Sequence, residues 1–284
     1  MKTVLRDVLV GVVFTALALP GYGGEIHTAI KDGDVAKVTA LLKANPKLVE
    51  ARDASAYGAT PLVVAATTGQ KEIAELLLAN KADIEAQDAG GWTALTKAVA
   101  NKHPEVVVVL LKHKANVNTA MMIGRTSLHY AVMNDDKPMA KLLLANGANP
   151  NLGTSNEYDP PPLHEALNKE MVELLLANKA DVDGKDHLGC TALHDAAFFD
   201  SKEIAAALIA NKADINARNK NGMTPLHRAA IRDSNAVAEL LLAKRADATL
   251  KDNDGKTALD VAMKHKSKLV AELLRGASKG SPSL

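Results

Sequence analysis

The sequence predicts an all-α protein built as a linear array of stacked repeats. A four-residue phrase, Thr-Pro-Leu-His or a close variant, begins at Thr60, Thr93, Thr126, Pro161, Thr191, Thr224 and Thr257. The steps between these positions are 33, 33, 35, 30, 33 and 33 residues. Aromatic residues make up only 3% of the chain, which suits thin layers of small helices rather than one thick core. Such a period indicates modules that each bury an apolar face against the next.

The N-terminal segment differs from the repeats. Lys2 and Arg6 precede an apolar run over residues 8–19, and Ala16-Leu17-Ala18 fits a small-x-small cleavage site. As a helix the run would span about 18 Å, less than the roughly 30 Å of bilayer hydrocarbon. We therefore expect residues 1–18 to be a signal peptide, with no membrane span after processing. The acidic Asp7 within this basic segment favours the alternatives, which are an uncleaved membrane anchor or a wrongly assigned start codon.

The signal prediction fixes the expected compartment and charge. A processed chain would be periplasmic or secreted, and a chain without a signal would be cytoplasmic. The formal net charge is +1, and removal of residues 1–18 leaves acidic and basic side chains balanced. No excess of cations is available for phosphate contacts, so we expect no binding to nucleic acid. Cys190 is the one cysteine, which excludes an internal disulfide.

Each repeat carries signals for two helices. Thr191 is a suitable N-cap, and Leu193, Ala196 and Ala197 form an apolar stripe along the first helix. Proline after the capping threonine, as at Pro61 and Pro225, suits a first helical turn. A second, Leu-rich helix is predicted in the blocks 73–80, 106–111, 139–146, 171–178, 204–211 and 237–242.

The phrase and its period of about 33 residues resemble the ankyrin repeat, a β-turn followed by two short helices. A degenerate copy at residues 26–30 precedes the seven others. With the signal segment, the chain is similar to exported members of bacterial type. The resemblance implies an all-α ankyrin-repeat solenoid of about eight helix-turn-helix repeats with β-hairpin fingers over residues 24–276. Residues 277–284 are expected to be a disordered tail.

Two features depart from the regular pattern. Ankyrin repeats usually place glycine after the second helix, where the chain turns left-handed, but this chain has Lys81, Lys179 and Lys212 at such positions. Either these lysines or the preceding asparagines must adopt that conformation. The fourth repeat gains two residues near 151–160 and the fifth loses three near Asn168. This irregular segment is either part of a binding face or drift in a tolerant loop.

Candidate catalytic and metal sites are weak. His27, His129, His164, His194 and His227 lie at least one repeat apart, which is a row along the array rather than a zinc cluster. In ankyrin repeats such a histidine usually stabilises the turn. The Gly-x-Ser-x-Gly match at 276–280 has no strand before it, and Cys190 has no evident base. We expect no enzyme activity, no cofactor and no metal.

The resemblance implies that a protein partner binds the concave face, which is formed by finger tips and the exposed ends of first helices. The aromatic residues from 25 onward fall on those positions, except for Tyr130. The candidate partner-binding residues are Tyr57, Trp92, Met122, Ile123, Arg125, Tyr158, Leu188, Phe198, Phe199, Met223 and Arg232. Exposed aromatic side chains act as anchors in interfaces, although packing against adjacent fingers would also explain them.

These observations predict a noncatalytic scaffold or regulator that binds a protein partner of unknown identity. The alternative function is a dedicated inhibitor or protector of one exported enzyme. The chain is expected to be a monomer.

Overall fold

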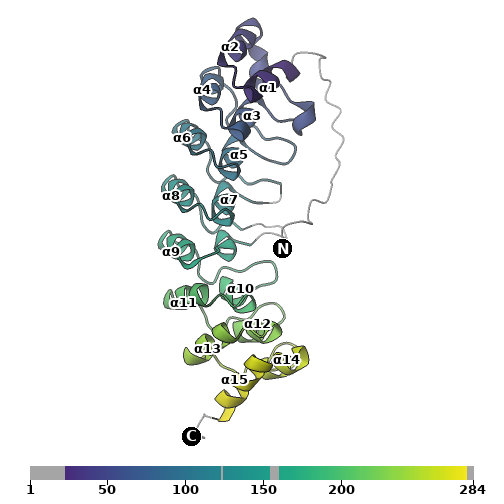
Figure 1. The fold of residues 1–284 in the computed structure, drawn as a ribbon, viewed down its shortest axis with the longest axis vertical. Coiled ribbons are helices and arrows are strands. Elements are labelled where there is room, and N and C mark those ends of the chain that lie inside the picture. Colours follow the sequence, from purple (N-terminus) through teal and green to yellow (C-terminus); the bar gives the residue numbers. More distant parts are fainter. Residues whose placement is uncertain (1–22, 123, 154–159, 280–284) are drawn as a thin grey trace.

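The computed structural model describes residues 23–122, 124–153 and 160–279, so the predicted signal peptide at 1–18 lies outside the described residues. Paired helices stack along the long axis of the molecule in two columns, with loops projecting from one side (Figure 1). The first column holds α1 (Gly23–Lys31), α3 (Pro61–Thr68), α5 (Ala94–Ala100), α7 (Ser127–Met133), α10 (Ala192–Phe198), α12 (Pro225–Arg232) and α14 (Ala258–His265). The predicted all-α solenoid is confirmed.

The second column holds the Leu-rich helices. These are α2 (Val35–Ala44), α4 (Lys71–Ala79), α6 (Pro104–Lys112), α8 (Lys137–Ala145), α9 (Lys169–Ala177), α11 (Lys202–Ala210), α13 (Asn235–Ala243) and α15 (Lys268–Lys279). The structure also contains the 3-10 helices η1 (Pro46–Glu50), η2 (Ala54–Ala56) and η3 (Pro162–Glu165). Helix α15 includes residues 277–279, which the sequence assigns to the tail, and residues 280–284 lie outside the described part.

The irregular repeat has a local physical cause. Its first helix is reduced to η3, because the missing residues bring Asn168 directly to the start of α9. The Asn168 side chain accepts a hydrogen bond from the Met171 N–H at 3.0 Å and so caps that helix. The shortened connection leaves Leu167 65% exposed. The pair η3 and α9 still stacks in register with its neighbours.

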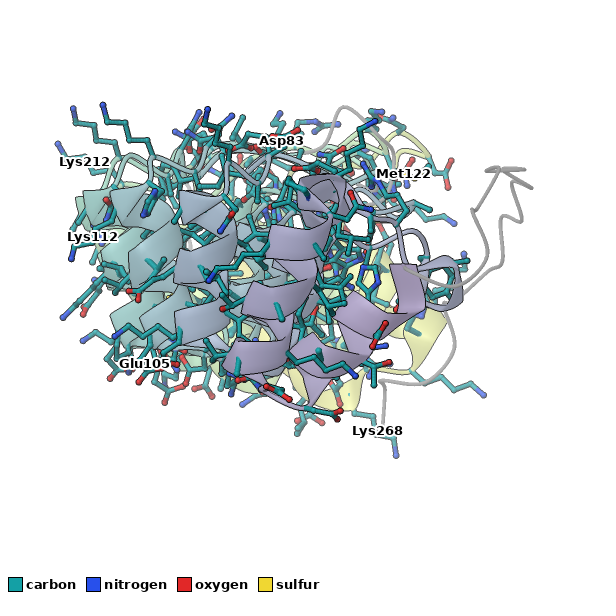
Figure 2. All side chains as sticks on the ribbon, turned by 90° about the horizontal axis from the view of Figure 1, so that it is seen from above. Asp83, Glu105, Lys112, Met122, Lys212 and Lys268 are labelled. Carbon is teal, nitrogen blue, oxygen red and sulfur yellow. The ribbon has the colours of Figure 1, made fainter. Side chains whose placement is uncertain are left out.

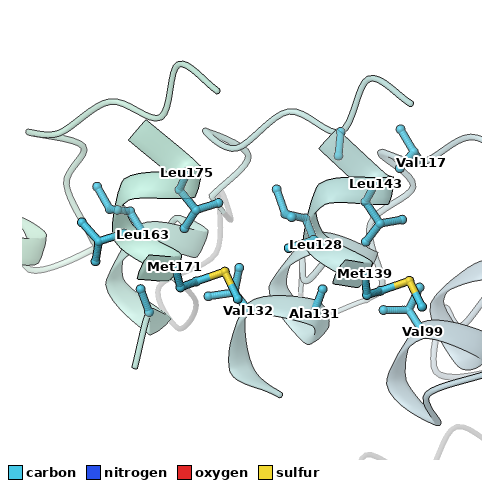
Figure 3. Close-up of a cluster of buried hydrophobic side chains, with 14 of the residues drawn as sticks. Val99, Val117, Leu128, Ala131, Val132, Met139, Leu143, Leu163, Met171 and Leu175 are labelled. Carbon is cyan, nitrogen blue, oxygen red and sulfur yellow. The ribbon is translucent and has the colours of Figure 1, made fainter. Parts of the chain in front are cut away.

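The core is a continuous layer between the two columns. Met139 and Met171 lie between successive repeats, and Leu128 packs near Leu143 (Figure 3). Leu128, Leu143 and Met171 are fully buried. Unbranched methionine fills the irregular spaces between layers, while alanine lets the first helices approach closely. Each module is therefore buried only by its neighbours.

The left-handed position after five of the second helices, α4, α6, α9, α11 and α13, is occupied by a lysine or arginine, and after α8 it is occupied by Gly147. Lys81, Lys179 and Lys212 have φ of 65°, 69° and 69°, whereas the preceding Asn80 has φ of −90°. Of the two alternatives left by the sequence, the lysine position is thus correct. A side chain in this conformation costs about 1 kcal/mol, which a cation at a helix C-terminus partly offsets.

The projecting fingers contain fewer paired backbone residues than full β-hairpins. The described residues contain three isolated bridges, Asp53–Ala59, Lys185–Thr191 and Lys251–Thr257, and no strand. Side-chain turns take the place of a longer ladder. For example, Asp88 Oδ1 accepts hydrogen bonds from the N–H groups of Gly90 and Trp92, at 2.8 and 3.0 Å.

A polar ladder joins successive repeats behind the fingers. In each step a side-chain oxygen accepts a hydrogen bond from a backbone N–H of the next repeat, at 2.6 to 2.9 Å. The acceptor and donor pairs are Glu50–Asp83, Glu85–Asn116, Asn118–Asn149, Asn151–Asp181, Asp183–Asp214 and Asn216–Asp247. The ladder continues through the irregular repeat, which explains why the array keeps its stacking there.

Candidate functional site

The histidine row is structural, as the sequence suggested. Thr191 N–H donates to His194 Nδ1 at 3.1 Å, and His194 Nε2 lies 3.0 Å from the carbonyl oxygen of Met223 in the next repeat. His129 and His227 make the same kinds of contacts with Pro160 and Lys256. Each ring therefore caps its own helix and fastens the following finger.

Burial determines the protonation of two of these rings. Burial lowers the pKa of His194, and this effect outweighs the hydrogen bond to the Met223 carbonyl and the nearby charge of Asp195. Burial likewise lowers the pKa of His227. Both rings are thus neutral near pH 7, in the form that accepts at Nδ1 and donates at Nε2.

His164 is different, because it lies in η3 without a capping threonine. Its Nδ1 is 2.7 Å from Asp195 Oδ2, and its Nε2 is 2.9 Å from the Gly184 carbonyl oxygen. Burial lowers the pKa of His164, but the hydrogen bond and charge of Asp195, together with the Gly184 carbonyl and the charge of Asp186, raise it by more, so the net shift is upward. This ion pair replaces the missing cap and ties the irregular repeat to α10.

Backbone hydrogen bonds connect the tips of neighbouring fingers. Backbone N–H groups of Ala89 and Lys220 donate to the carbonyl oxygens of Tyr57 and Leu188 in the preceding fingers, at 2.8 and 2.9 Å. Met122 lies on this side of the molecule, opposite Lys112 and Lys212 (Figure 2). Tyr57 is 80% exposed and Met122 is 66% exposed. Large apolar side chains are thus held in water on the projecting loops.

One aromatic cluster joins the second finger, which carries Trp92, to helices α5 and α7. The Trp92 ring centroid lies 4.9 Å from that of Tyr130, and the Lys97 ammonium lies 4.2 Å above the Trp92 ring. Lys97 also pairs with Asp88 at 3.6 Å. Tyr130 and Lys97, which were not among the candidate partner-binding residues, both contact Trp92. We define Trp92, Lys97 and Tyr130 as the tryptophan cluster.

A second cluster lies on α10 and α12. The rings of Phe198 and Phe199 meet edge to face at 5.2 Å, and the guanidinium carbons of Arg228 and Arg232 lie 4.3 and 5.1 Å from the Phe198 centroid. Phe199 remains 62% exposed. Arg228 was not a candidate because it lies in the middle of α12, whereas the candidate positions lie at the ends of the first helices. We define these four residues as the phenylalanine cluster.

The other candidate residues are less concentrated. Leu188 is exposed at its finger tip and Met223 is half-buried. Arg125 lies 3.7 Å from Glu165 and so joins the third finger to η3. Ile123 and Tyr158 lie outside the described residues. The described contacts thus bring together three candidates, Phe198, Phe199 and Arg232, whereas Trp92 packs against residues that were not among the candidates.

Other kinds of site find little support in the described ranges. No group of three His, Cys, Asp or Glu side chains is placed there to hold a metal ion. Cys190 is buried, and burial raises the pKa of its thiol, which disfavours the reactive thiolate. No helix between residues 23 and 279, in the described part, is both long and apolar enough to cross a membrane.

Comparison with known families decides the classification. Models of ankyrin repeats match residues 25–88, 85–154 and 128–219 (three copies) and residues 208–262 (many copies). This chain belongs to the ankyrin repeat family. Ankyrin repeats generally mediate protein–protein interactions, and the proteins that carry them are typically noncatalytic scaffolds.

Individual ankyrin proteins resemble parts of the chain. Ankyrin repeat domain-containing protein 13C-A of Xenopus laevis is 32% identical over 72 residues, which are 25% of this chain and 13% of that protein. Protein 13C-B of the same organism is 33% identical over the same length. The crystal structure of the human ASB11 ankyrin repeat domain matches with a TM-score of 0.67 and 26% identity. It covers 79% of this chain and all of that domain.

Proposed function

We propose that this ankyrin repeat protein is a noncatalytic scaffold or regulator that binds a protein partner on its concave face. The observation that supports this most is the exposure of Tyr57, Met122 and Phe199 along the finger side. Each leaves more than half of a large apolar side chain in water. Such side chains gain binding energy when a partner covers them.

The proposal includes export of the protein as a monomer. Residues 1–18 would be removed, which would leave the chain periplasmic or secreted. N-terminal sequencing of the protein recovered outside the cytoplasm should begin at Leu19. An intact Met1 in that fraction would contradict cleavage, and recovery only from the cytoplasm would contradict export.

The binding test removes exposed anchors without disturbing the core. The double variant Tyr57→Ala, Phe199→Ala is expected to retain the fold while losing about tenfold or more in affinity for a captured partner. The control variant Val35→Ala, Val108→Ala removes apolar side chains that are 40% and 43% exposed on second-column helices. It should bind like the wild type. Equal binding by both variants would contradict the concave-face proposal.

The alternative, a dedicated inhibitor or protector of one exported enzyme, predicts a different capture result. Affinity capture followed by mass spectrometry would then return one enzyme in a fixed stoichiometry. Several unrelated proteins, recovered in sub-stoichiometric amounts, would favour the scaffold instead.

A further inference from the structure

The phenylalanine cluster holds two cations against one ring. Arg228 and Arg232 lie one turn apart on α12, and both guanidinium groups lie within about 5 Å of the Phe198 centroid, as measured above. Two like charges so close repel each other. The ring offsets part of this cost through its cation–π contacts with both groups.

Neither arginine is paired within the described part of the chain. Both lack an ion pair and a side-chain hydrogen bond to a described residue, and the buried Nε atom of Arg228 has no hydrogen-bond partner. An enclosed guanidinium N–H without an acceptor is uncommon, because it has lost water and gained nothing in return. Because that Nε atom is itself buried, an acceptor from outside the described chain would bind the terminal nitrogens of the half-buried Arg228 and of the exposed Arg232.

The carboxylates closest in sequence and in the adjoining repeat already have partners. Asp195 contacts His164, Asp233 Oδ1 accepts from the Val270 N–H at 3.0 Å, and Asp200 Oδ1 accepts from the Val237 N–H at 2.9 Å. These bonds connect neighbouring repeats. Turning a carboxylate toward the arginines would break a contact that stabilises the stacking.

Apolar surface adjoins the two cations. Phe199 packs edge to face on Phe198 and leaves 62% of its surface exposed, and Leu188 is 49% exposed on the finger of the same repeat. A ligand that matches this surface carries both negative charge and an apolar side chain. The planar forks of arginine fit carboxylate groups in a bidentate manner.

We infer that the phenylalanine cluster is a docking site for an acidic peptide segment of a protein, in which Asp or Glu side chains bind Arg228 and Arg232 and an adjacent apolar side chain covers Phe199. The inference rests on the proposed concave-face binding and names the chemistry of the partner.

The test selects random linear peptides on the full chain and compares variants with the peptides obtained. Recovered peptides should be rich in Asp and Glu and contain an apolar residue. The variant Arg228→Gln, Arg232→Gln should weaken their binding by about tenfold or more. A charge-matched control, Lys141→Gln, Lys202→Gln on exposed faces of α8 and α11, should leave it unchanged.

A second variant distinguishes loss of the binding contacts from loss of the fold. Arg228→Lys, Arg232→Lys keeps both charges but removes the planar forks, so it should bind with intermediate affinity. Recovered peptides without acidic residues, or peptides that bind the Gln variant as well as wild type, would overturn the inference. So would enrichment only after phosphorylation of the library, which would assign the arginines to phosphate.

These outcomes separate the inference from the proposed function. Non-acidic peptides that lose affinity for the Tyr57→Ala, Phe199→Ala variant would leave concave-face binding intact and remove the acidic specificity. Failure to select any peptide, or equal binding to all variants, would count against both.

Discussion

The contribution of His194 to the stacking of repeats can be measured with two substitutions. His194 is fully buried, caps α10 through Thr191 and contacts the Met223 carbonyl of the next repeat. Removing the ring by His194→Ala breaks about two hydrogen bonds, worth about 1 kcal/mol each, and leaves a cavity. We expect the free energy of unfolding to fall by about 3 kcal/mol.

The chain itself suggests the second substitution. In the third repeat the same position is Thr96, whose hydroxyl accepts from the Thr93 N–H at 2.9 Å and so completes the cap. The variant His194→Thr should therefore keep the cap and lose mainly the contact with Met223. The expected loss is about 1–2 kcal/mol, and the difference from His194→Ala measures the cap.

Equilibrium urea unfolding, followed by far-UV circular dichroism, gives both values. Lys202→Thr, an exposed change in the first turn of α11, serves as a control and should alter stability by no more than about 0.5 kcal/mol. Equal stability of His194→Thr and wild type would refute the view that the ring fastens adjacent repeats. Equal losses for Thr and Ala would refute the capping role.

Three further predictions concern the core, the turns and pH. Leu143→Ala, at a fully buried site, should cost about 3–5 kcal/mol in urea unfolding, and a loss below about 1 kcal/mol would contradict the packing described. Gly147→Ala should cost only about 1 kcal/mol, because φ is 86° and nothing lies within 4 Å of an added Cβ, whereas Gly91→Ala should cost more, since its Cβ would lie 2.6 Å from Met122 N. The pKa of His194 is lowered, so the stability it provides is present above its usual value near 6.5 and lost as pH falls. The pKa of His164 is raised, so its contribution is complete below about 6.5 and lost as pH rises through the folded value. The loss of stability caused by His194→Thr should therefore shrink on acidification, while that caused by His164→Gln should grow, and parallel trends would contradict these assignments.

The repeat period predicted the helix pairs because one short signal recurred at fixed spacing. The same spacing argued against a histidine metal cluster, because a row with one member per repeat is not compact, and the resemblance to ankyrin repeats implied that these histidines stabilise the turn. The choice between Lys81 and Asn80 in the left-handed turn was not accessible, because both residue types occur there and the outcome depends on the cap geometry. The sequence predicted an irregular segment near Asn168 but not the reduction of the first helix to η3, which depends on the capping of α9 by Asn168.

The candidate surface was predicted less completely than the fold. From the equivalent positions of each repeat we could predict that Trp92 and Phe198 lie on the surface. The side chains that contact their rings could not be predicted in this way. Tyr130 and Arg228 belong to helices of the following repeat, whose positions relative to those rings depend on stacking, whereas Lys97 lies on α5 of the same repeat as Trp92. Contacts between neighbouring repeats determine which side chains lie in one cluster. These contacts cannot be read from the position of a residue within its own repeat.

The polar ladder gives the rod an edge of nearly fixed length. Its donors are backbone N–H groups held by turns, so lengthening that edge would break six bonds between Glu50 and Asp247 in turn. Bending of the array would then pivot about this edge and change the span between the tryptophan and phenylalanine clusters. A change in that distance would let the two clusters contact partners of different size, while the contacts within each cluster stay the same.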